Sequence, residues 1–497
     1  MSDLLLGIDI GTASSKGVLA RPTGEIVATA ERAHEFAVPR PGWAEHDAEA
    51  VWWDDLVAIC RELAPPDEAA IAAVCVSGIG PCLLPVDETG RPLRPAILYG
   101  IDTRATAEID ELNRRYGADS ILARGGSPLT TQAVGPKLLW LRHNEPDVFE
   151  RTRGFLMASS FAVKRLTGEY VLDHHSASQC DPLYDIHESR WIEELADEIA
   201  PGVRLPRLLW PSEVAGRVTR GAAEATGLPE GTEVAAGTVD AWAEAVSAGV
   251  RKPGDTMLMY GSTMFIIEIL AEPLTHPKLW STNGVFPGTP TLAAGMATSG
   301  ALTAWLRKIA GEPSYDELVA EAAATPPGAD GLVVLPYFAG ERTPLFDPAA
   351  RGVVCGLTLA HGRGHLYRSL LEGTAYGVRH NLEAMDDAGG GTRRLVAVGG
   401  GTKGGLWTQV VSDVTGQPQE LPRHTIGASY GDALLAGIGA GLLDTDADWS
   451  EAAETVVADP RTAELYDRLY NLYRDLYGAT RDHTHALAEL QAGDNIR

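Results

Sequence analysis

The sequence predicts an α/β protein built from two related halves, and three observations support this. An apolar run, residues 4–10, leads into a turn of small and hydroxyl residues and then into a second apolar run, residues 17–20. The same order recurs as residues 256–260, the turn Gly261-Ser262-Thr263, and residues 264–267, about half the chain further on. Between the copies lies Arg251-Lys252-Pro253-Gly254, a Pro-Gly link typical of a boundary. We therefore expect two α/β domains, residues 1–248 and 249–497.

Composition limits the classes of partner. At 497 residues, with 45% hydrophobic and 22% charged residues, the chain can form two or three domains, each with its own core. The net charge of −26 argues against nucleic acid or an anionic membrane as the main partner, because both attract clustered Lys and Arg. The 5 cysteines are scattered and form no C-x-x-C pair, which favours free thiols in the cytoplasm.

The first hairpin has the residue types of a phosphate site. Asp9 ends the first strand, and the turn that follows ends in a cation. Backbone N–H groups and hydroxyls of such a turn can bind phosphate oxygens, and a nearby carboxylate can hold Mg²⁺ through water. The turn residues that we place near phosphate are Thr12, Ser14, Ser15 and Lys16. An ordinary glycine-rich hairpin explains this stretch equally well.

The elements that follow keep an α/β order. Residues 48–63 have the apolar spacing of a helix, and residues 72–78 form a buried strand that ends in a loop at Gly80 and Pro81. Residues 97–104 bring Asp102 and Arg104 to a strand end, and residues 106–169 are mainly helical. This pair could form a surface ion pair or a clamp for substrate hydroxyls.

A second acid lies at another strand end. Asp240 follows a strand and a tight turn, residues 233–239, and precedes a helix, residues 241–249. An aspartate beside apolar residues can have its pKa raised enough to act as a base, while aspartate is also a common helix N-cap. The residues alone favour the cap.

Residues 399–404 match the dinucleotide-binding pattern G-x-G-x-x-G. They follow an apolar strand, residues 395–398, and precede a helix, with Glu420 at about the expected distance. A Rossmann-type NAD site is therefore an open alternative. The position in the second half of the chain, the additional Gly405 and the two hydroxyl-rich hairpins favour instead a loop beneath adenine or ribose.

Together, these motifs resemble the FGGY family of carbohydrate kinases, and the xylulokinase branch in particular. The resemblance covers essentially the whole chain, and its most specific part is a long ordered run in the second half. That run comprises residues 336–344 (PYFAGERTP), 347–352 (DPAARG), 356–358 (GLT) and 371–376 (LEGTAY), and residues 9–12 (DIGT) and 166–170 (LTGEY) add to it. The family implies two ribonuclease-H-like domains of the actin–hexokinase type, with ATP in the interdomain catalytic cleft.

The resemblance also implies residue roles. Asp9 would serve the Mg²⁺–phosphate site, and Asp240 matches the catalytic base. Gly261, Ser262 and Thr263 would form the second phosphate hairpin. Gly300, Gly400, Gly401 and Gly404 would line the adenosine site. Gly80, Pro81, Asp102 and Arg104 would join Asp240 on the sugar side.

Three departures from the xylulokinase pattern lie on sugar-facing elements. Gly80 and Pro81 replace a Met-His pair, Ala241 replaces the usual Asn after the catalytic acid, and residues 99–104 are one residue longer. We expect an ATP- and Mg²⁺-dependent kinase for D-xylulose or a related ketose or polyol. Its partner is a small molecule, and a homodimer is an open alternative. An NAD-dependent oxidoreductase or an actin-like ATPase without a sugar substrate also stays open.

Overall fold

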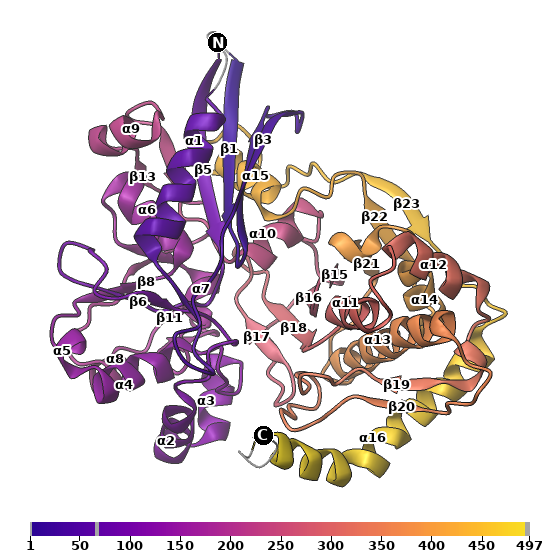
Figure 1. Ribbon diagram of the computed structural model, residues 1–497. Coiled ribbons are helices and arrows are strands. Elements are labelled where there is room, and N and C mark those ends of the chain that lie inside the picture. Colours follow the sequence, from indigo (N-terminus) through magenta and orange to yellow (C-terminus); the bar gives the residue numbers. More distant parts are fainter. Residues whose placement is uncertain (1, 65–68, 493–497) are drawn as a thin grey trace. The chain divides into compact units, whose positions relative to one another are not determined.

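The chain divides into two compact units that interleave along the sequence. A computed structural model describes residues 2–64 and 69–492 (Figure 1). Unit 1 comprises residues 1–251, 269–291 and 426–450, and unit 2 comprises residues 252–268, 292–425 and 451–497. The matching halves are present, and the boundary at residue 248 stays a prediction.

Unit 1 contains a six-stranded sheet with the order β13-β14-β5-β1-β2-β3. β1, β2 and β3 form two successive antiparallel hairpins, β5 lies parallel to β1, and β14 lies parallel to β5. The strands are β1 (Ser2–Ile10), β2 (Ser14–Ala20), β3 (Ile26–Ala33), β5 (Ala69–Gly78), β13 (Val214–Arg217) and β14 (Glu233–Ala235).

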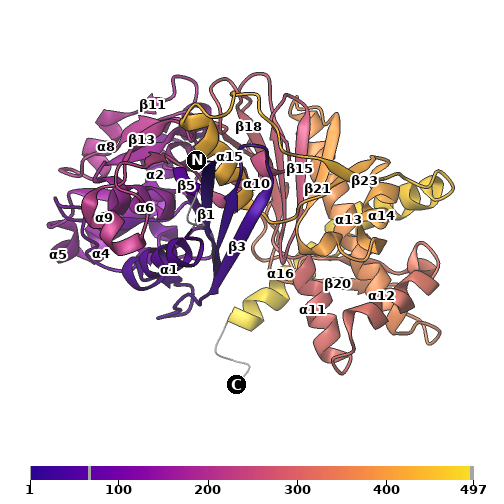
Figure 2. The same cartoon turned by 90° about the horizontal axis from the view of Figure 1, so that it is seen from above.

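Helices cover both faces of this sheet. α1 (Asp54–Glu62) and α6 (Ala158–Thr167) lie on one face, and α10 (Asp240–Ser247) and α15 (Ala428–Gly439) lie on the other (Figure 2). Glycines permit close approach on each face. A Cβ at Gly7 would lie 1.9 Å from the carbonyl oxygen of Ser429 in α15, and one at Gly17 would lie 2.3 Å from Ile59 in α1. α15 therefore packs directly on the backbone of β1.

The remainder of unit 1 is mainly helical and has its own apolar core around Leu138, Phe155 and Tyr184. Its helices are α2 (Thr106–Tyr116), α3 (Ala118–Gly125), α4 (Val134–Asn144), α5 (Pro146–Phe149), α7 (His174–Ser178), α8 (Glu193–Ile199) and α9 (Arg220–Thr226). Its short strands are β4 (Glu45–His46), β6 (Leu84–Val86), β7 (Ala96–Ile97), β8 (Gly154–Leu156), β9 (Val171–Asp173), β10 (Tyr184–Asp185), β11 (Arg190–Trp191) and β12 (Arg207–Leu209).

Unit 2 repeats the strand order and the strand directions of unit 1. Its sheet has the order β17-β18-β16-β15-β21-β22-β23, with β15 and β16 antiparallel and with β15, β21 and β22 parallel. The spatial order β18-β16-β15-β21-β22 in this sheet thus corresponds to the order β3-β2-β1-β5-β14 in the sheet of unit 1. This correspondence confirms the internal repeat. The strands are β15 (Asp255–Tyr260), β16 (Met264–Ile269), β18 (Thr291–Met296), β21 (Arg394–Val398), β22 (Gln419–Pro422) and β23 (Ala452–Val456). The edge strand β17 (Trp280–Thr282) belongs to the residues of unit 1.

Long helices complete unit 2. They are α11 (Gly300–Ile309), α12 (Tyr315–Ala324), α13 (Arg363–Asp387), α14 (Leu406–Thr415) and α16 (Ala463–Ala492), with a short hairpin of β19 (Val333–Leu335) and β20 (Val353–Cys355). The helix predicted over residues 48–63 is present, and its first turns, Ala48–Trp53, are π-helical. Across residues 2–64 and 69–492, none of the helices combines the length and apolar character needed to cross a membrane.

Candidate active site

Asp9 lies at the carboxyl end of β1, between two strands that carry polar residues. In the sheet register it is opposite Lys16 on β2 and Ser77 on β5. Residues directly opposite one another project from the same face of a sheet. Gly7, two residues earlier on β1, meets α15, so Asp9 belongs to the face that α10 and α15 cover.

α10 brings two further acids to this face. Asp240 is its first residue, and Glu244 lies one turn later, so the two side chains share one side of the helix. The backbone N–H of Ala241 donates to Oδ1 of Asp240 over 2.7 Å, which fixes the carboxyl. The predicted catalytic residue and the predicted metal residue therefore belong to one cluster within unit 1.

The pKa values of these acids are raised, mainly by burial. Burial and then the charge of Asp9 raise the pKa of Asp240 well above its ordinary value. Burial raises the pKa of Glu244 to about 7, with Asp9 adding to the shift and Lys16 opposing it. Burial raises the pKa of Asp9 to about 6, against the lowering influence of Lys16 and His34. Lys16 thus offsets the shifts of Asp9 and Glu244 only in part.

The cluster fits a hard cation at Asp9. Oδ1 of Asp9 is buried and makes no hydrogen bond, which leaves one carboxylate oxygen for a ligand. Carboxylate oxygens are the ligands that Mg²⁺ accepts, usually with several waters retained. Among residues 2–64 and 69–492, no group of three or more His, Cys, Asp or Glu side chains forms a ready-made metal cage. The donor set therefore suits a largely hydrated ion.

Asp432 of α15 is a further acid near the cluster, and it binds the strand neighbour of Asp9. Its Oδ2 accepts a 2.6 Å hydrogen bond from the hydroxyl of Ser77, the β5 neighbour of Asp9. Burial raises the pKa of Asp432 well above the ordinary value, and Asp9 adds to this shift. This residue was absent from the sequence-based site. Its signal in the sequence is a single acid inside the apolar helix at 428–439.

The predicted phosphate-binding residues of the first hairpin lie on two opposite faces of the unit 1 sheet. β2 begins at Ser14, so only residues 11–13 form the turn. Ser14 and Lys16 alternate with Ser15, and Lys16 shares the face of Asp9. Ser15 is fully buried on the other face, where its hydroxyl donates to Asp55 Oδ2 over 2.8 Å. The expectation that Ser15 faces phosphate is therefore corrected: strand alternation turns it toward α1.

The loop after β5 reaches the turn that carries Asp240. A Cβ at Gly80 would lie 2.7 Å from Cγ2 of Val239, the residue before Asp240, and Gly78 pairs with Val239 in an isolated bridge. Pro81 is buried behind Gly80. The loop at Gly80 thus contacts the residue that precedes Asp240, and a shared role of Gly80, Pro81 and Asp240 at the sugar stays a prediction. Thr12 joins this region through a 3.3 Å contact between its Oγ1 and the Tyr99 hydroxyl.

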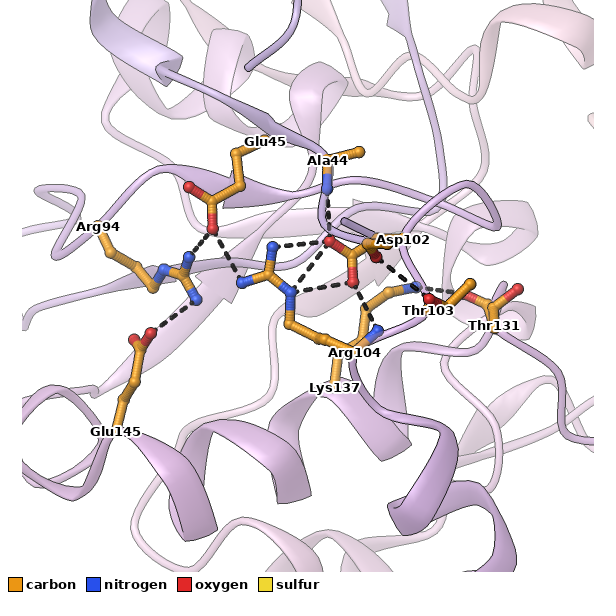
Figure 3. A network of polar contacts seen from close by, with 10 residues as sticks. Ala44, Glu45, Arg94, Asp102, Thr103, Arg104, Thr131, Lys137 and Glu145 are labelled. Atoms are coloured by element: carbon orange, nitrogen blue, oxygen red, sulfur yellow. Dashed lines mark hydrogen bonds and ion pairs between the residues drawn. The ribbon is translucent and has the colours of Figure 1, made fainter. Parts of the chain in front are cut away.

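Asp102 and Arg104 belong to a buried network instead of an exposed clamp (Figure 3). Both side chains are 0% exposed, and Arg104 Nη2 lies 2.6 Å from Asp102 Oδ2. Arg104 also pairs with Glu45 over 2.8 Å, and Arg94 joins Glu45 to Glu145. Acidic and basic side chains therefore alternate along this network of ion pairs. Neither the predicted surface pair nor the predicted hydroxyl clamp describes it, because the side chains of Asp102 and Arg104 are buried and paired with each other.

Aromatic rings and one lysine enclose the same network. The Arg104 guanidinium lies 3.9 Å from the ring centroid of Trp43 and 5.1 Å from that of Trp140. Lys137 Nζ donates to the carbonyls of Thr131 over 2.6 Å and Gln132 over 3.2 Å, and burial lowers its pKa to about 8. The network therefore holds the loop at residues 99–104 against α4.

In unit 2, the second hairpin is held from one side by the start of α11. Gly300 N donates to Gly261 O over 3.0 Å, and Ser299 N donates to Ser262 O over 3.0 Å. A Cβ at Gly300 would lie 2.5 Å from Gly261 O, so only glycine fits there. Gly261, Ser262 and Gly300 are thus brought together, with Thr263 completing the turn between β15 and β16.

The glycine loop at residues 399–405 lies at the same end of the unit 2 sheet. β21 runs parallel to β15, so Gly399 follows its strand beside Tyr260, where a Cβ would meet Tyr260 O at 2.7 Å. A Cβ at Gly401 would lie 2.8 Å from the Trp407 ring. Gly400 and Gly401 form a short 3₁₀ turn, and Gly404 has a φ of 90° in open space. The predicted adenosine residues therefore gather next to the second hairpin.

Comparison with known proteins agrees with both units. Residues 4–247 match the N-terminal domain and residues 256–440 the C-terminal domain of the FGGY family of carbohydrate kinases. The chain belongs to this family. As an FGGY kinase it transfers a phosphoryl group from ATP to a sugar or polyol, and the oxidoreductase and ATPase alternatives have no support.

Individual relatives cover nearly the full chain. A xylulose kinase from Bacillus subtilis is 27% identical over 97% of this chain and 98% of its own. A glycerol kinase from Citrifermentans bemidjiense is 33% identical over 90% of this chain and 92% of its own. The crystal structure of a xylulose kinase from Rhodospirillum rubrum has a TM-score of 0.89 and 35% identity, and covers 97% of this chain and 100% of that one. The fold is that of actin–hexokinase-type sugar kinases.

Proposed function

We propose that this kinase phosphorylates a primary hydroxyl of D-xylulose or of a related ketose or polyol, with Asp240 as the catalytic base. The observation that carries this proposal is the raised pKa of Asp240 in a cluster with Asp9 at the start of α10. General bases work best when their pKa lies near the working pH, and burial shifts an aspartate in that direction.

Asp240 takes the proton of the substrate hydroxyl as that oxygen attacks the γ-phosphorus of ATP. The O–H bond breaks, a P–O bond forms, and the bond to the leaving ADP oxygen breaks in line. The Ala241 N–H holds the carboxyl in one orientation. Burial and then the negative charges of Asp9 and Glu244 hold the pKa of Asp240 high. Because bound substrate displaces water from this site, the sugar hydroxyl becomes the acceptor.

Lys16, Ser14 and the turn amides of the first hairpin are proposed to bind the phosphates from unit 1. Gly261, Ser262 and Thr263 are proposed to bind them from unit 2, with Gly300, Gly400, Gly401 and Gly404 against adenosine. Asp9 would hold a hydrated Mg²⁺, which when bound neutralises charge on the phosphate oxygens. A cytoplasmic setting and a homodimer stay predictions.

The substrate class follows from the relatives and from the sugar-side residues. Several relatives are named xylulose kinases and others glycerol kinases, so both a ketose and a short polyol are candidates. Gly80, Pro81 and Ala241 present no side-chain donor or acceptor near Asp240. We therefore propose a substrate held by fewer hydrogen bonds at this end than the xylulokinase pattern provides.

A coupled assay of ADP release tests the proposal. Mg-ATP is offered with ketoses, aldoses, polyols and sugar acids, with D-xylulose and glycerol as reference members. Stimulation by a ketose or polyol well above the no-sugar rate supports the proposed class. A best rate with an aldose or a sugar acid would overturn the substrate class and leave the kinase assignment intact.

A further inference from the structure

His34 contacts the first phosphate hairpin from the side of the sheet that α1 covers. It follows β3 directly, and its backbone N–H donates to Ala13 O over 3.0 Å. Its ring Nε2 lies 3.1 Å from Gly11 O. One residue therefore binds two carbonyls of the turn at residues 11–13.

Asp55 of α1 holds the other side of the ring. Oδ2 of Asp55 lies 2.8 Å from Nδ1 of His34 and also accepts the hydroxyl of Ser15 over 2.8 Å. The side chains of His34 and Asp55 are only 7% and 15% exposed. Because the turn, β2 and α1 all contact this pair, the ring has little freedom to leave.

The partners of the ring require both nitrogens to carry hydrogen. Nε2 faces a carbonyl and Nδ1 faces a carboxylate, and each of these groups only accepts hydrogen bonds. Both bonds form when His34 is an imidazolium. Burial lowers the pKa of His34, but the hydrogen bonds to Asp55 and to the Gly11 carbonyl outweigh it, so the pKa is raised in agreement. The adjacent His46 stays neutral, since its Nδ1 accepts from Trp52 and burial lowers its pKa to about 4.

Binding these carbonyls orients the amides of the turn. In a trans peptide, the C=O of one residue and the N–H of the next point in opposite directions. With Gly11 O and Ala13 O turned toward His34, the N–H groups of Thr12 and Ser14 point away from it. Backbone amides turned outward in this way can bind phosphate oxygens.

We propose that His34, held by Asp55, is a positioning residue that sets the first hairpin in its phosphate-binding conformation. This inference rests on the proposed role of the hairpin in binding ATP. The imidazolium also places one positive charge behind the turn, where it favours the bound phosphates. In unit 2, the start of α11 holds the carbonyls of the second hairpin in the same way, so each hairpin has a dedicated support.

The test compares ligands with and without the β- and γ-phosphates. Affinities for a non-hydrolysable ATP analogue and for AMP are measured by calorimetry for the wild type and for His34→Ala, His34→Gln and Asp55→Asn, with Mg²⁺ present. Glu35→Ala, an exposed change at the next residue, is the matched control. Thermal unfolding verifies that each variant is folded, and KM is measured for ATP and for the sugar.

We expect His34→Ala to weaken binding of the ATP analogue about tenfold, the factor expected for one lost hydrogen bond to a charged group. AMP affinity and the KM for sugar should stay within about twofold, because these ligands do not need the β- and γ-phosphate contacts. His34→Gln keeps an N–H donor and should recover part of the loss. Asp55→Asn removes the charge that holds the imidazolium. Its affinity for the ATP analogue should lie between the affinities of His34→Ala and His34→Gln.

Equal weakening of AMP and of the ATP analogue in His34→Ala would overturn the proposal, since it would indicate a general loss of structure. Unchanged affinity for the ATP analogue in a folded His34→Ala variant would also overturn it. The binding comparison needs no turnover. A wild type that phosphorylates no sugar would therefore count against the proposed function and leave this test decisive.

Discussion

Among single residues, Asp240 differs from an ordinary helix-capping aspartate through the acids around it. The sequence alone favoured the cap, since aspartate before a helix is common. In the structure Val239 is the N-cap and Asp240 is the first helical residue, so the cap prediction is wrong. The Asp240 carboxyl accepts the N–H of the adjacent Ala241, and burial and the charge of Asp9 raise its pKa. The one position therefore combines a helix start with a carboxyl of high proton affinity.

Asp240→Asn should lower kcat by roughly 10²–10⁴-fold, because the amide cannot take the hydroxyl proton. The affinity for ATP should change little, since the substitution preserves shape and hydrogen bonding at the helix start. Steady-state kinetics and calorimetry with the ATP analogue measure the two quantities. Turnover near the wild-type rate in this variant would remove Asp240 from the role of base.

Glu244 should make the stability of the nucleotide-free enzyme depend on pH. Its pKa is about 4.5 when unfolded and about 7 when folded, so the folded state holds its proton more tightly. The stabilisation that this proton provides is fully present below pH 4.5 and is lost as the pH rises through about 7. The position of Glu244, one helical turn after Asp240, can be seen in the sequence. The burial that shifts its pKa cannot, because it comes from the tertiary structure.

Glu244→Gln should therefore be neutral near pH 4.5 and stabilising above pH 7. The gain has an upper limit of about 3 kcal/mol, which corresponds to the full shift, and water near the side chain will reduce it. Urea unfolding between pH 4.5 and 8.5, without Mg²⁺ or nucleotide, measures the difference. Exposed Glu193→Gln is the control. An equal gain at both ends of the pH range would contradict the assigned cause.

At the scale of elements, the contact of α15 with α10 and β1 holds the acid cluster together. A Cβ at Gly431 of α15 would lie 2.0 Å from Ala243 O of α10, and a Cβ at Gly7 would meet α15 in the same way. The two hairpins could be predicted from the sequence because each is a local pattern. The position of α15 could not, because no local pattern links residues 7 and 431.

Gly431→Ala should destabilise the enzyme by about 1–3 kcal/mol, since backbone atoms must move to admit the methyl group. It should also lower kcat, because α10 carries Asp240. Gly221→Ala is the matched control in helix α9, where a Cβ meets nothing within 4 Å. That change should stabilise by up to about 1 kcal/mol through helix propensity. Chemical unfolding and kinetics of both variants check the contrast.

The buried network of Arg104 should respond as a structural element. Arg104→Ala removes the guanidinium partner of the buried Asp102 and leaves Glu45 with Arg94 alone, which should cost about 3–5 kcal/mol. Arg190→Ala breaks an exposed pair with Glu188 and should cost less than about 1 kcal/mol. A small effect of Arg104→Ala in urea unfolding would indicate that the network is not the support described above. The residues of this network were visible in sequence, but their burial depends on Trp43 and Trp140 packing over them.

For the whole molecule, ligand-induced stabilisation separates the nucleotide classes. A ligand present at about 100 times its Kd stabilises the folded state by about 2.7 kcal/mol. Mg-ATP should raise the midpoint of thermal unfolding accordingly, and NADH at the same concentration should leave it unchanged. Stabilisation by NADH alone would restore the dinucleotide interpretation of residues 399–404.

The interleaving of the units has a consequence for synthesis on the ribosome. β1 emerges first, but α15, which packs on its backbone at Gly7, emerges more than 400 residues later. Until then the face that bears Asp9 lacks the part of its native cover that α15 supplies. An early release of the nascent chain after residue 251 would leave that apolar surface open to aggregation. Unit 1 is therefore the first to begin in translation but is completed only with residues 426–450, and chaperones that shield nascent chains have a defined segment to protect.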